Sequence, residues 1–365
     1  MPVYWAITNR KGNIMPIANL RPFLEDARKN KYCLGCFNVF NIETLEGAVE
    51  AAINLQTPVV CAVYEPQLKY SDLETFANLV KDVSNKVNVP LILHLDHAVE
   101  ISTIIYAIKC GFTSLMYDGP VGLDFEDKIK RTKQFADIVH SVGLMAEAEV
   151  GYITRVGQDE GSAEASLTNA KMAVEFVEKT GVDILAPAIG SIHGLTEQKA
   201  ALNLEMLQQI RQMTDCYLSL HGGSGVDDGI VGQAIDCGIN KASVYTRISA
   251  LAVKKLKELI LKDAPDLAVL LNEVRNGYRE MIENRLTVFR STNVCSFRSN
   301  VCELSFASPY DKTDNHPASA NIGILPDQKA GPSSGNAFRQ ESYNSPKLDS
   351  MIEEITKQIL SGLKK

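Results

Sequence analysis

Short apolar runs alternate with longer amphipathic stretches along most of the chain, a pattern typical of alternating strands and helices. Among the helical stretches, 71–87 carries its large apolar residues on one stripe, and 167–181 closes with a glycine that predicts a helix C-cap. Eight runs are predicted as strands: 35–40 (GCFNVF), 58–64 (PVVCAVY), 90–96 (PLILHLD), 112–118 (FTSLMYD), 143–150 (GLMAEAEV), 182–189 (VDILAPAI), 216–221 (CYLSLH) and 239–245 (INKASVY).

Eight strands, each followed by a helix, predict an α/β fold of the (β/α)₈ TIM-barrel type. The rival is a doubly wound open sheet. That fold commonly carries a GxGxxG motif after its first strand, and the stretch after 35–40 contains none. The barrel is therefore the favoured architecture.

Composition narrows the range of functions. The chain has 365 residues, of which 45% are hydrophobic and 22% charged, with a formal net charge of −7. An acidic balance without a basic run gives no support for nucleic-acid binding. The start of the chain lacks the pattern of a secretory signal, and no apolar stretch is long enough to predict a membrane span.

The eight cysteines are scattered through the chain, which is more typical of the reducing cytoplasm than of a disulfide framework. Cys33 and Cys36 form a single CxxC. Because no second CxxC accompanies them and a predicted strand begins within the motif, metal or redox use of this pair is disfavoured.

Polar residues recur at or just after the ends of the predicted strands. They are Asn38, Asp96, His97, Asp118, Glu147, Glu149, His193, His221, Ser243 and Thr246. In a (β/α)₈ barrel the carboxyl ends of the strands and the loops beyond them build the active site. The barrel hypothesis therefore gathers all of these side chains at one mouth.

Three of the histidines, His97, His193 and His221, stand at three different strand ends. Neutral imidazoles suit Zn²⁺, and three protein ligands leave one position open for chemistry. Any one of them, taken alone, is better explained as a hydrogen-bonded core residue, but three at one mouth favour a metal site. His94 has HxxH spacing with His97 and could be a fourth ligand. We favour instead a role in which it supports the ligands without binding the metal itself.

The segment HGGSG, 221–225, follows the seventh predicted strand. Its glycines let backbone N–H groups turn toward an anion, and Ser224 adds a hydroxyl. Many barrels hold a phosphate in the loops after strands seven and eight. Glycine clusters alone are usually turns, so the prediction of a phosphate site depends on the position of this one beside His221.

Taken together, these motifs resemble the class II, metal-dependent ketose-bisphosphate aldolases, the group of fructose- and tagatose-bisphosphate aldolases. The resemblance runs from about Ile17 to Ser291. The motifs that carry it, in order, are GCFNVFN (35–41), LHLDHA (93–98), FTSLMYDGP (112–120), AEAEVG (146–151), TGVDILAPAIGSIHG (180–194), SLHGGSGV (219–226) and GINKASVYT (238–246).

The resemblance implies an activity: reversible cleavage of a ketose phosphate or bisphosphate to dihydroxyacetone phosphate and an aldehyde, through a zinc-stabilised enediolate. It makes Asp96 the residue that moves the proton of the aldehyde-derived hydroxyl. The other roles that it implies are zinc ligands for His97, His193 and His221, and a second position for a divalent or monovalent cation at Asp118 and Glu149. It also implies a phosphate cradle at Gly194, Gly222, Gly223 and Ser224, completed by the backbone of the strand end from Ser243 to Thr246, and a substrate contact for Asn38.

The chain departs from the family at several places, of which two bear most on the expected activity. Ser243 stands where the family usually has an asparagine that contacts the enediolate portion of the substrate, and Tyr245 and Arg247 replace small or acidic residues. The loop after the fifth strand, 154–162, differs from the family's GGxED, so either Glu160 or Asp159 could be its catalytic acid, with Glu160 preferred. We expect a shifted aldol substrate or reduced activity.

The ends of the chain extend beyond the resemblance. We expect an N-terminal extension over 1–16, the barrel over 17–291, a variable segment and flexible linker over 292–345, and an amphipathic helix over 346–365. This last helix either packs on the barrel or an oligomer interface, or docks onto a partner. A docking helix after a linker is similar to the targeting tails of enzymes packaged in bacterial microcompartments.

Three functions therefore compete. The favoured one is an active aldolase, a cytoplasmic homodimer or homotetramer with a phosphorylated sugar as substrate and no nucleic-acid or membrane partner. The second is a catalytically weakened homologue that binds phosphate ligands. In the third, the tail helix is the main functional element, docking to a scaffold or microcompartment shell, and the barrel is its cargo.

Overall fold

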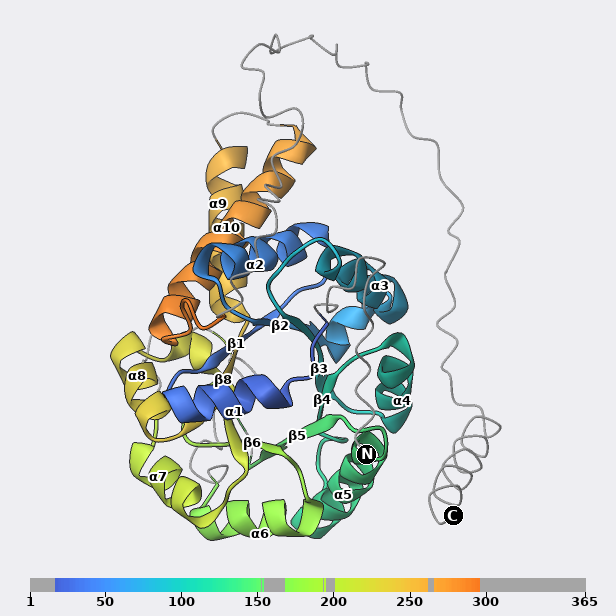
Figure 1. Cartoon of the computed structure of the whole chain (residues 1–365), viewed down its shortest axis with the longest axis vertical. Coiled ribbons are helices and arrows are strands. Elements are labelled where there is room, and N and C mark those ends of the chain that lie inside the picture. Colours follow the sequence, from blue (N-terminus) through green and yellow to red (C-terminus); the bar gives the residue numbers. More distant parts are fainter. Residues whose placement is uncertain are drawn as a thin grey trace, which may run out of the picture. The chain divides into compact units, whose positions relative to one another are not determined.

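The computed structural model describes residues 17–151, 153, 168–192, 194, 201–261 and 266–295. Within these ranges, eight strands form a closed parallel barrel in which each strand pairs with the next along the chain and the last pairs with the first (Figure 1). The predicted (β/α)₈ barrel is confirmed, and the open sheet is excluded.

The strands match the predicted runs to within a few residues. They are β1 (Leu34–Asn38), β2 (Val59–Tyr64), β3 (Leu91–Ala98), β4 (Ser114–Tyr117), β5 (Met145–Val150), β6 (Ile184–Pro187), β7 (Tyr217–Leu220) and β8 (Ile239–Val244). Nearly every strand residue is buried, because the helices cover the outer face and side chains fill the interior.

A helix follows each strand. These helices are α2 (Ile42–Leu55), α3 (Leu73–Ser84), α4 (Ile101–Cys110), α5 (Phe125–Ser141), α6 (Ala170–Thr180), α7 (Leu204–Met213), α8 (Asp228–Asp236) and α9 (Thr246–Ile260). Their ends follow local rules: the Asn41 side chain caps α2 by accepting from the Thr44 N–H, and Gly181 ends α6 with φ 73°, as predicted.

Two further helices in the described ranges lie outside this alternation and were not predicted from the sequence. Helix α1 (Arg21–Asn30) crosses the barrel opening in Figure 1. It buries Leu24 and Ala27 against apolar strand residues such as Ile92 and Ile184. It therefore closes the amino end of the barrel with an apolar plug. Helix α10 (Leu267–Val288) packs against α2, where a Cβ on Gly47 would lie 2.6 Å from the Arg275 carbonyl oxygen.

Short 3₁₀ turns lie after two of the strands: η1 (Glu65–Lys69) after β2 and η2 (Gly223–Gly225) after β7. No helix in the described part of the chain is long and apolar enough to cross a membrane. The cysteines in these ranges are free thiols, Cys33 and Cys36 among them.

Candidate active site

The interior of the barrel changes from apolar to polar along the strands. Side chains two residues apart point into the same interior, so each strand contributes successive layers. Near the α1 plug the layer is apolar and includes Leu34, Ile92 and Ile184. Toward the carboxyl ends the interior is polar, with buried residues two positions apart on three strands: His94 and Asp96 on β3, Glu147 and Glu149 on β5, and Lys241 and Ser243 on β8.

A β-bulge in β3 turns two successive side chains toward the mouth. Leu95 pairs with Leu115 and Ala98 with Tyr117, so the two residues between them on β3 face a single residue of β4. His97 takes a left-handed conformation, φ 53°, which is uncommon outside glycine and is tolerated better by histidine than by most residues. The bulge explains how neighbouring Asp96 and His97 can serve one site, because an unbroken strand would point them to opposite faces.

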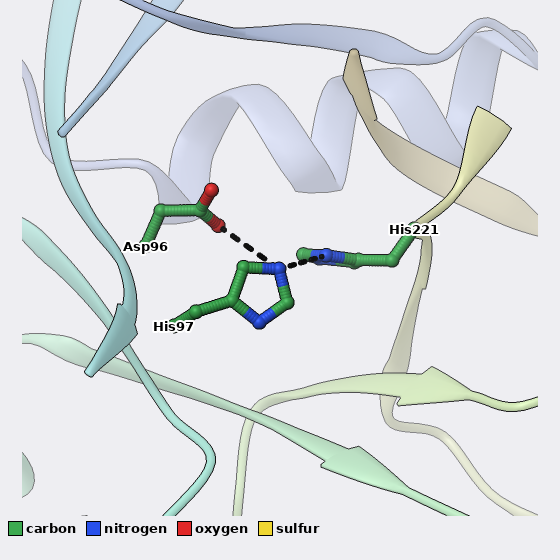
Figure 2. A group of neighbouring side chains, drawn as sticks. All are labelled: Asp96, His97 and His221. Carbon is green, nitrogen blue, oxygen red and sulfur yellow. Dashed lines mark hydrogen bonds and ion pairs between the residues drawn. The ribbon is translucent and has the colours of Figure 1, made fainter. Parts of the chain in front are cut away.

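The imidazoles of His97 and His221 meet at the centre of the mouth, with Asp96 beside them (Figure 2). His97 Nδ1 donates to Asp118 Oδ2 at 2.7 Å, and its Nε2 is hydrogen-bonded to His221 Nδ1 at 3.1 Å. The other nitrogen of His221, Nε2, donates to Glu147 Oε1 at 3.0 Å. A carboxylate therefore stands behind each ring and turns its inner nitrogen toward the other ring.

Burial would lower the pKa of His97, but the carboxylates of Asp118 and Asp96 outweigh it and raise that pKa to about 10. Burial and the neighbouring His97 lower the pKa of His221. A proton on His97 Nε2 would then lie between the two inner nitrogens. A metal ion would take the place of this proton, since metal ligands must release theirs.

The donor set fits a metal ion. Ligand atoms of Asp96, His97 and His221 lie within 4.8 Å of one another, and so do those of His97, Asp118 and Glu149. Asp96 Oδ1 and Asp118 Oδ1 are buried and accept no hydrogen bond from the described residues. The separation of 3.1 Å between the inner nitrogens is close to the roughly 3.3 Å expected for two ligands of a tetrahedral Zn²⁺.

Asp96 is held as an ionised carboxylate. Burial would raise its pKa, but the imidazoles of His97, His221 and His94 together with Lys241 hold it below its usual range. Asn38 Nδ2 donates to Asp96 Oδ2 at 2.8 Å, which fixes one oxygen and leaves Oδ1 beside the imidazoles. Asn38 and Asp96, both predicted to contact the substrate, are thus hydrogen-bonded to each other.

Glu149 lies on the other side of His97, close to Asp118. Burial and the Asp118 carboxylate raise the pKa of Glu149 to about 7. Its Oε1 accepts from the Ile153 N–H at 3.2 Å. A cation between the two carboxylates would relieve their repulsion, so these residues fit the second cation position expected for them.

A charged layer lies beneath these residues, in the barrel interior. Lys241 Nζ lies 3.0 Å from Glu147 Oε1 and 2.8 Å from Oε2, and all three of Lys241, Glu147 and His94 are fully buried. His94 Nδ1 is hydrogen-bonded to Ser114 at 2.8 Å, and its Nε2 lies 3.8 Å from Asp96 Oδ1 and from Glu147 Oε2. We did not assign Glu147 and Lys241 roles from sequence, although each stands two residues before a predicted site residue on the same strand face.

The glycine-rich loop after β7 lies against the end of β8. Gly222 has φ 68°, and a Cβ there would lie 2.8–2.9 Å from the backbone of Ile192, so only glycine fits. A Cβ on Gly223 would lie 3.9 Å from the Ser243 carbonyl oxygen, and one on Gly225 would lie 3.7 Å from that of Gly194. The residues predicted as a phosphate cradle are thus brought together at one edge of the mouth, where Thr246 begins α9.

Several sequence predictions fall outside the described residues: the third imidazole, His193, the loop acid, Glu160 or Asp159, the extension 1–16, nearly all of the segment 292–345 and the helix over 346–365.

The comparisons with known proteins agree with this geometry. The family described as "Fructose-bisphosphate aldolase class-II" matches residues 18–294. The chain is 32% identical to a sulfofructosephosphate aldolase of Alkalicoccus urumqiensis (75% of this chain, 96% of the relative) and 32% identical to a fructose-bisphosphate aldolase of Geobacillus stearothermophilus (68% and 88%). The crystal structure of the YdjI aldolase from Escherichia coli K12 superimposes with a TM-score of 0.68 at 31% identity, covering 76% of this chain and 98% of that one.

The charged layer generates a stability prediction. Lys241→Met keeps the apolar stem but leaves Glu147 as a buried carboxylate without its cation. Breaking a buried pair in this way costs about 3–5 kcal/mol, so we expect the free energy of unfolding to fall by that amount. Urea denaturation after removal of metal by a chelator measures it.

The matched control removes both charges, in the double variant Glu147→Gln/Lys241→Met. Since no charge then lies buried alone, it should be more stable than Lys241→Met. If the double variant is equally or less stable, the ammonium does not stabilise the barrel through Glu147.

Proposed function

We propose that this chain, which belongs to the class II fructose-bisphosphate aldolase family and is a carbon–carbon lyase, reversibly cleaves a ketose phosphate to dihydroxyacetone phosphate and an aldehyde. The reaction would depend on one Zn²⁺ ion. The observation that carries the proposal is the pair of buried imidazoles, His97 and His221, each backed by a carboxylate, with Asp96 beside them.

His97 and His221 would hold the ion, with His193 as third ligand. A bound Zn²⁺ supplies a Lewis acid for the substrate carbonyl, which stabilises the negative charge that develops when the carbon–carbon bond breaks. Asp118 and Glu149 would provide a second cation position, for a divalent or monovalent ion. Nitrogen and oxygen donors with one open position are what Zn²⁺ takes in catalytic sites.

Asp96 would move the proton of the hydroxyl on the aldehyde half. In cleavage the hydroxyl on the aldehyde half gives its proton to Asp96, its oxygen becomes the aldehyde carbonyl, and the bond between the two halves breaks. The electron pair of that bond stays with the three-carbon half as an enediolate, which is then protonated on carbon to give dihydroxyacetone phosphate. We assign that second proton transfer to Glu160, and condensation reverses both steps.

The phosphate of the three-carbon half would lie in the cradle formed by Gly194, Gly222, Gly223, Ser224 and Thr246. Asn38 orients Asp96 through its 2.8 Å hydrogen bond and would also face the substrate. These residues fix one half of the substrate only. The names of the relatives point to different aldehyde halves, one of them sulfonated. The proposal therefore names dihydroxyacetone phosphate as one product and leaves the aldehyde to the assay below.

The wider setting follows from the composition and the family. The scattered cysteines favour a cytoplasmic enzyme, and the aldolase family is one of carbohydrate metabolism. A place in glycolysis and a homodimeric or homotetrameric state are proposed from the family resemblance alone. Docking of the predicted helix over 346–365 to a microcompartment shell stays a separate proposal. Its motive is the order of features in the sequence: the barrel, a segment poor in large apolar residues, and then a short stretch with one apolar stripe.

A coupled assay for release of dihydroxyacetone phosphate tests the proposal. The metal-loaded enzyme is offered fructose and tagatose bisphosphates and sulfofructose phosphate, with and without a chelator. We expect turnover of at least one of them, lost with chelator and restored by Zn²⁺. Turnover that survives complete removal of metal would contradict the metal-dependent mechanism.

Asp96→Asn tests the proton transfer. The amide cannot accept the hydroxyl proton, so turnover should fall by about 10²–10⁴-fold, the usual contribution of general acid–base catalysis. Zinc content should stay near one per chain if the imidazoles hold the ion. Unchanged turnover would assign the proton to another group, and loss of zinc would make Asp96 a ligand.

The alternative function, a weakened homologue that binds phosphate ligands, depends on Ser243. Its Oγ lies 3.3 Å from Lys241 Nζ and 3.4 Å from His221 Nε2, and it stands where the family has asparagine. Ser243→Asn should raise turnover if the serine has weakened the enzyme. A fall would mean that Ser243 is adapted to a different substrate, and Ser243→Ala would show whether its hydroxyl matters.

A further inference from the structure

Arg247 ties the glycine-rich loop to the start of α9. Its guanidinium donates to two carbonyl oxygens of the loop, through Nε to Ser224 O at 2.8 Å and through Nη2 to Val226 O at 3.2 Å. Its backbone N–H donates to Ser224 Oγ at 3.3 Å. One residue therefore fixes two peptide groups and a hydroxyl of the loop.

The far side of the guanidinium is fixed as well. Nη1 of Arg247 donates to Asp228 Oδ1 at 3.2 Å. Asp228 in turn accepts two hydrogen bonds, of 2.6 and 2.9 Å, from Arg285 of α10, whose side chain is almost fully buried. The loop is thus anchored through Arg247 and Asp228 to a buried residue of another helix.

These contacts use Nε, Nη1 and Nη2 of the guanidinium, so this group holds the loop in place. The Ser224 hydroxyl can still donate to a ligand, because its Oγ accepts from the Arg247 N–H and its own hydrogen is left to point at another acceptor. The loop itself is rich in glycine, and glycine loses more backbone freedom on ordering than any other residue. A loop of this kind binds an anion well only if other contacts have already ordered it, because ordering it on binding would weaken the affinity.

We infer that Arg247 is a positioning residue for the phosphate end of the substrate, holding Ser224 and its neighbouring peptides in the geometry of the cradle. The inference rests on the proposed function and deepens it. It also explains one departure of this chain, since the family usually has a small or acidic residue at this position. Neither kind of side chain could donate to the two carbonyl oxygens.

The test compares phosphorylated and unphosphorylated ligands on the metal-loaded enzyme. Calorimetry gives the Kd of dihydroxyacetone phosphate and of dihydroxyacetone for the wild type and Arg247→Met. We expect the Kd of the phosphorylated ligand to rise about tenfold, because the loop must then be ordered on binding, with the unphosphorylated ligand unaffected. In turnover, KM should rise by a similar factor while kcat stays within about twofold.

The matched control is Arg290→Met. Arg290 is also an arginine braced on α8, with hydrogen bonds to both oxygens of Asp236 and to the Gly232 carbonyl, but none to the loop. It should leave both Kd values unchanged. Arg247→Lys keeps the charge without the planar fork and should behave like Arg247→Met.

Two outcomes would overturn the inference: an unchanged Kd for dihydroxyacetone phosphate in Arg247→Met, or full recovery in Arg247→Lys, which would make charge the cause. If Arg247→Met does not fold, Arg247→Gln replaces it. Failure of the proposed function looks different: the wild type would then turn over no ketose phosphate. Competition by inorganic phosphate would in that case still report whether Arg247 shapes an anion site.

Discussion

Two imidazole nitrogens 3.1 Å apart in a buried mouth are the arrangement on which the rest of this site depends. The two rings could not both face each other with lone pairs, so a proton or a metal ion must lie between them. In the metal-free protein that is a proton, kept on His97 by the carboxylates beside it. The same carboxylates fix which nitrogen faces inward, and this makes the pair ready for a metal ion.

The bulge in β3 and the charged layer beneath it serve this pair. Without the left-handed conformation of His97, its ring and the Asp96 carboxylate would lie on opposite faces of the strand. Without Lys241, the Glu147 carboxylate behind His221 would be a lone buried charge. A polar layer inside a barrel is costly, and in this chain it lies directly under the residues proposed to bind the metal.

Hydrophobic periodicity predicted the eight strands, and polar residues at their ends predicted the mouth, because both patterns are local in sequence. The plug α1 and the helix α10 were missed because neither belongs to the repeat. The bulge could not be foreseen, since it depends on register between β3 and β4. Glu147 was predicted at the mouth without a role, and the place of Lys241 beside it could have been inferred from its two-residue spacing to Ser243. The roles of His193 and Glu160, which lie outside the described residues, stay predictions.

The most direct test of this account is X-ray absorption at the zinc edge of the zinc-loaded protein. The account predicts a first shell of nitrogen and oxygen only, at about 2.0–2.1 Å, with outer-shell scattering from at least two imidazoles. In His221→Ala one imidazole contribution should disappear. A sulfur shell near about 2.3 Å, or a spectrum unchanged by His221→Ala, would contradict the claim that His97 and His221 hold the metal.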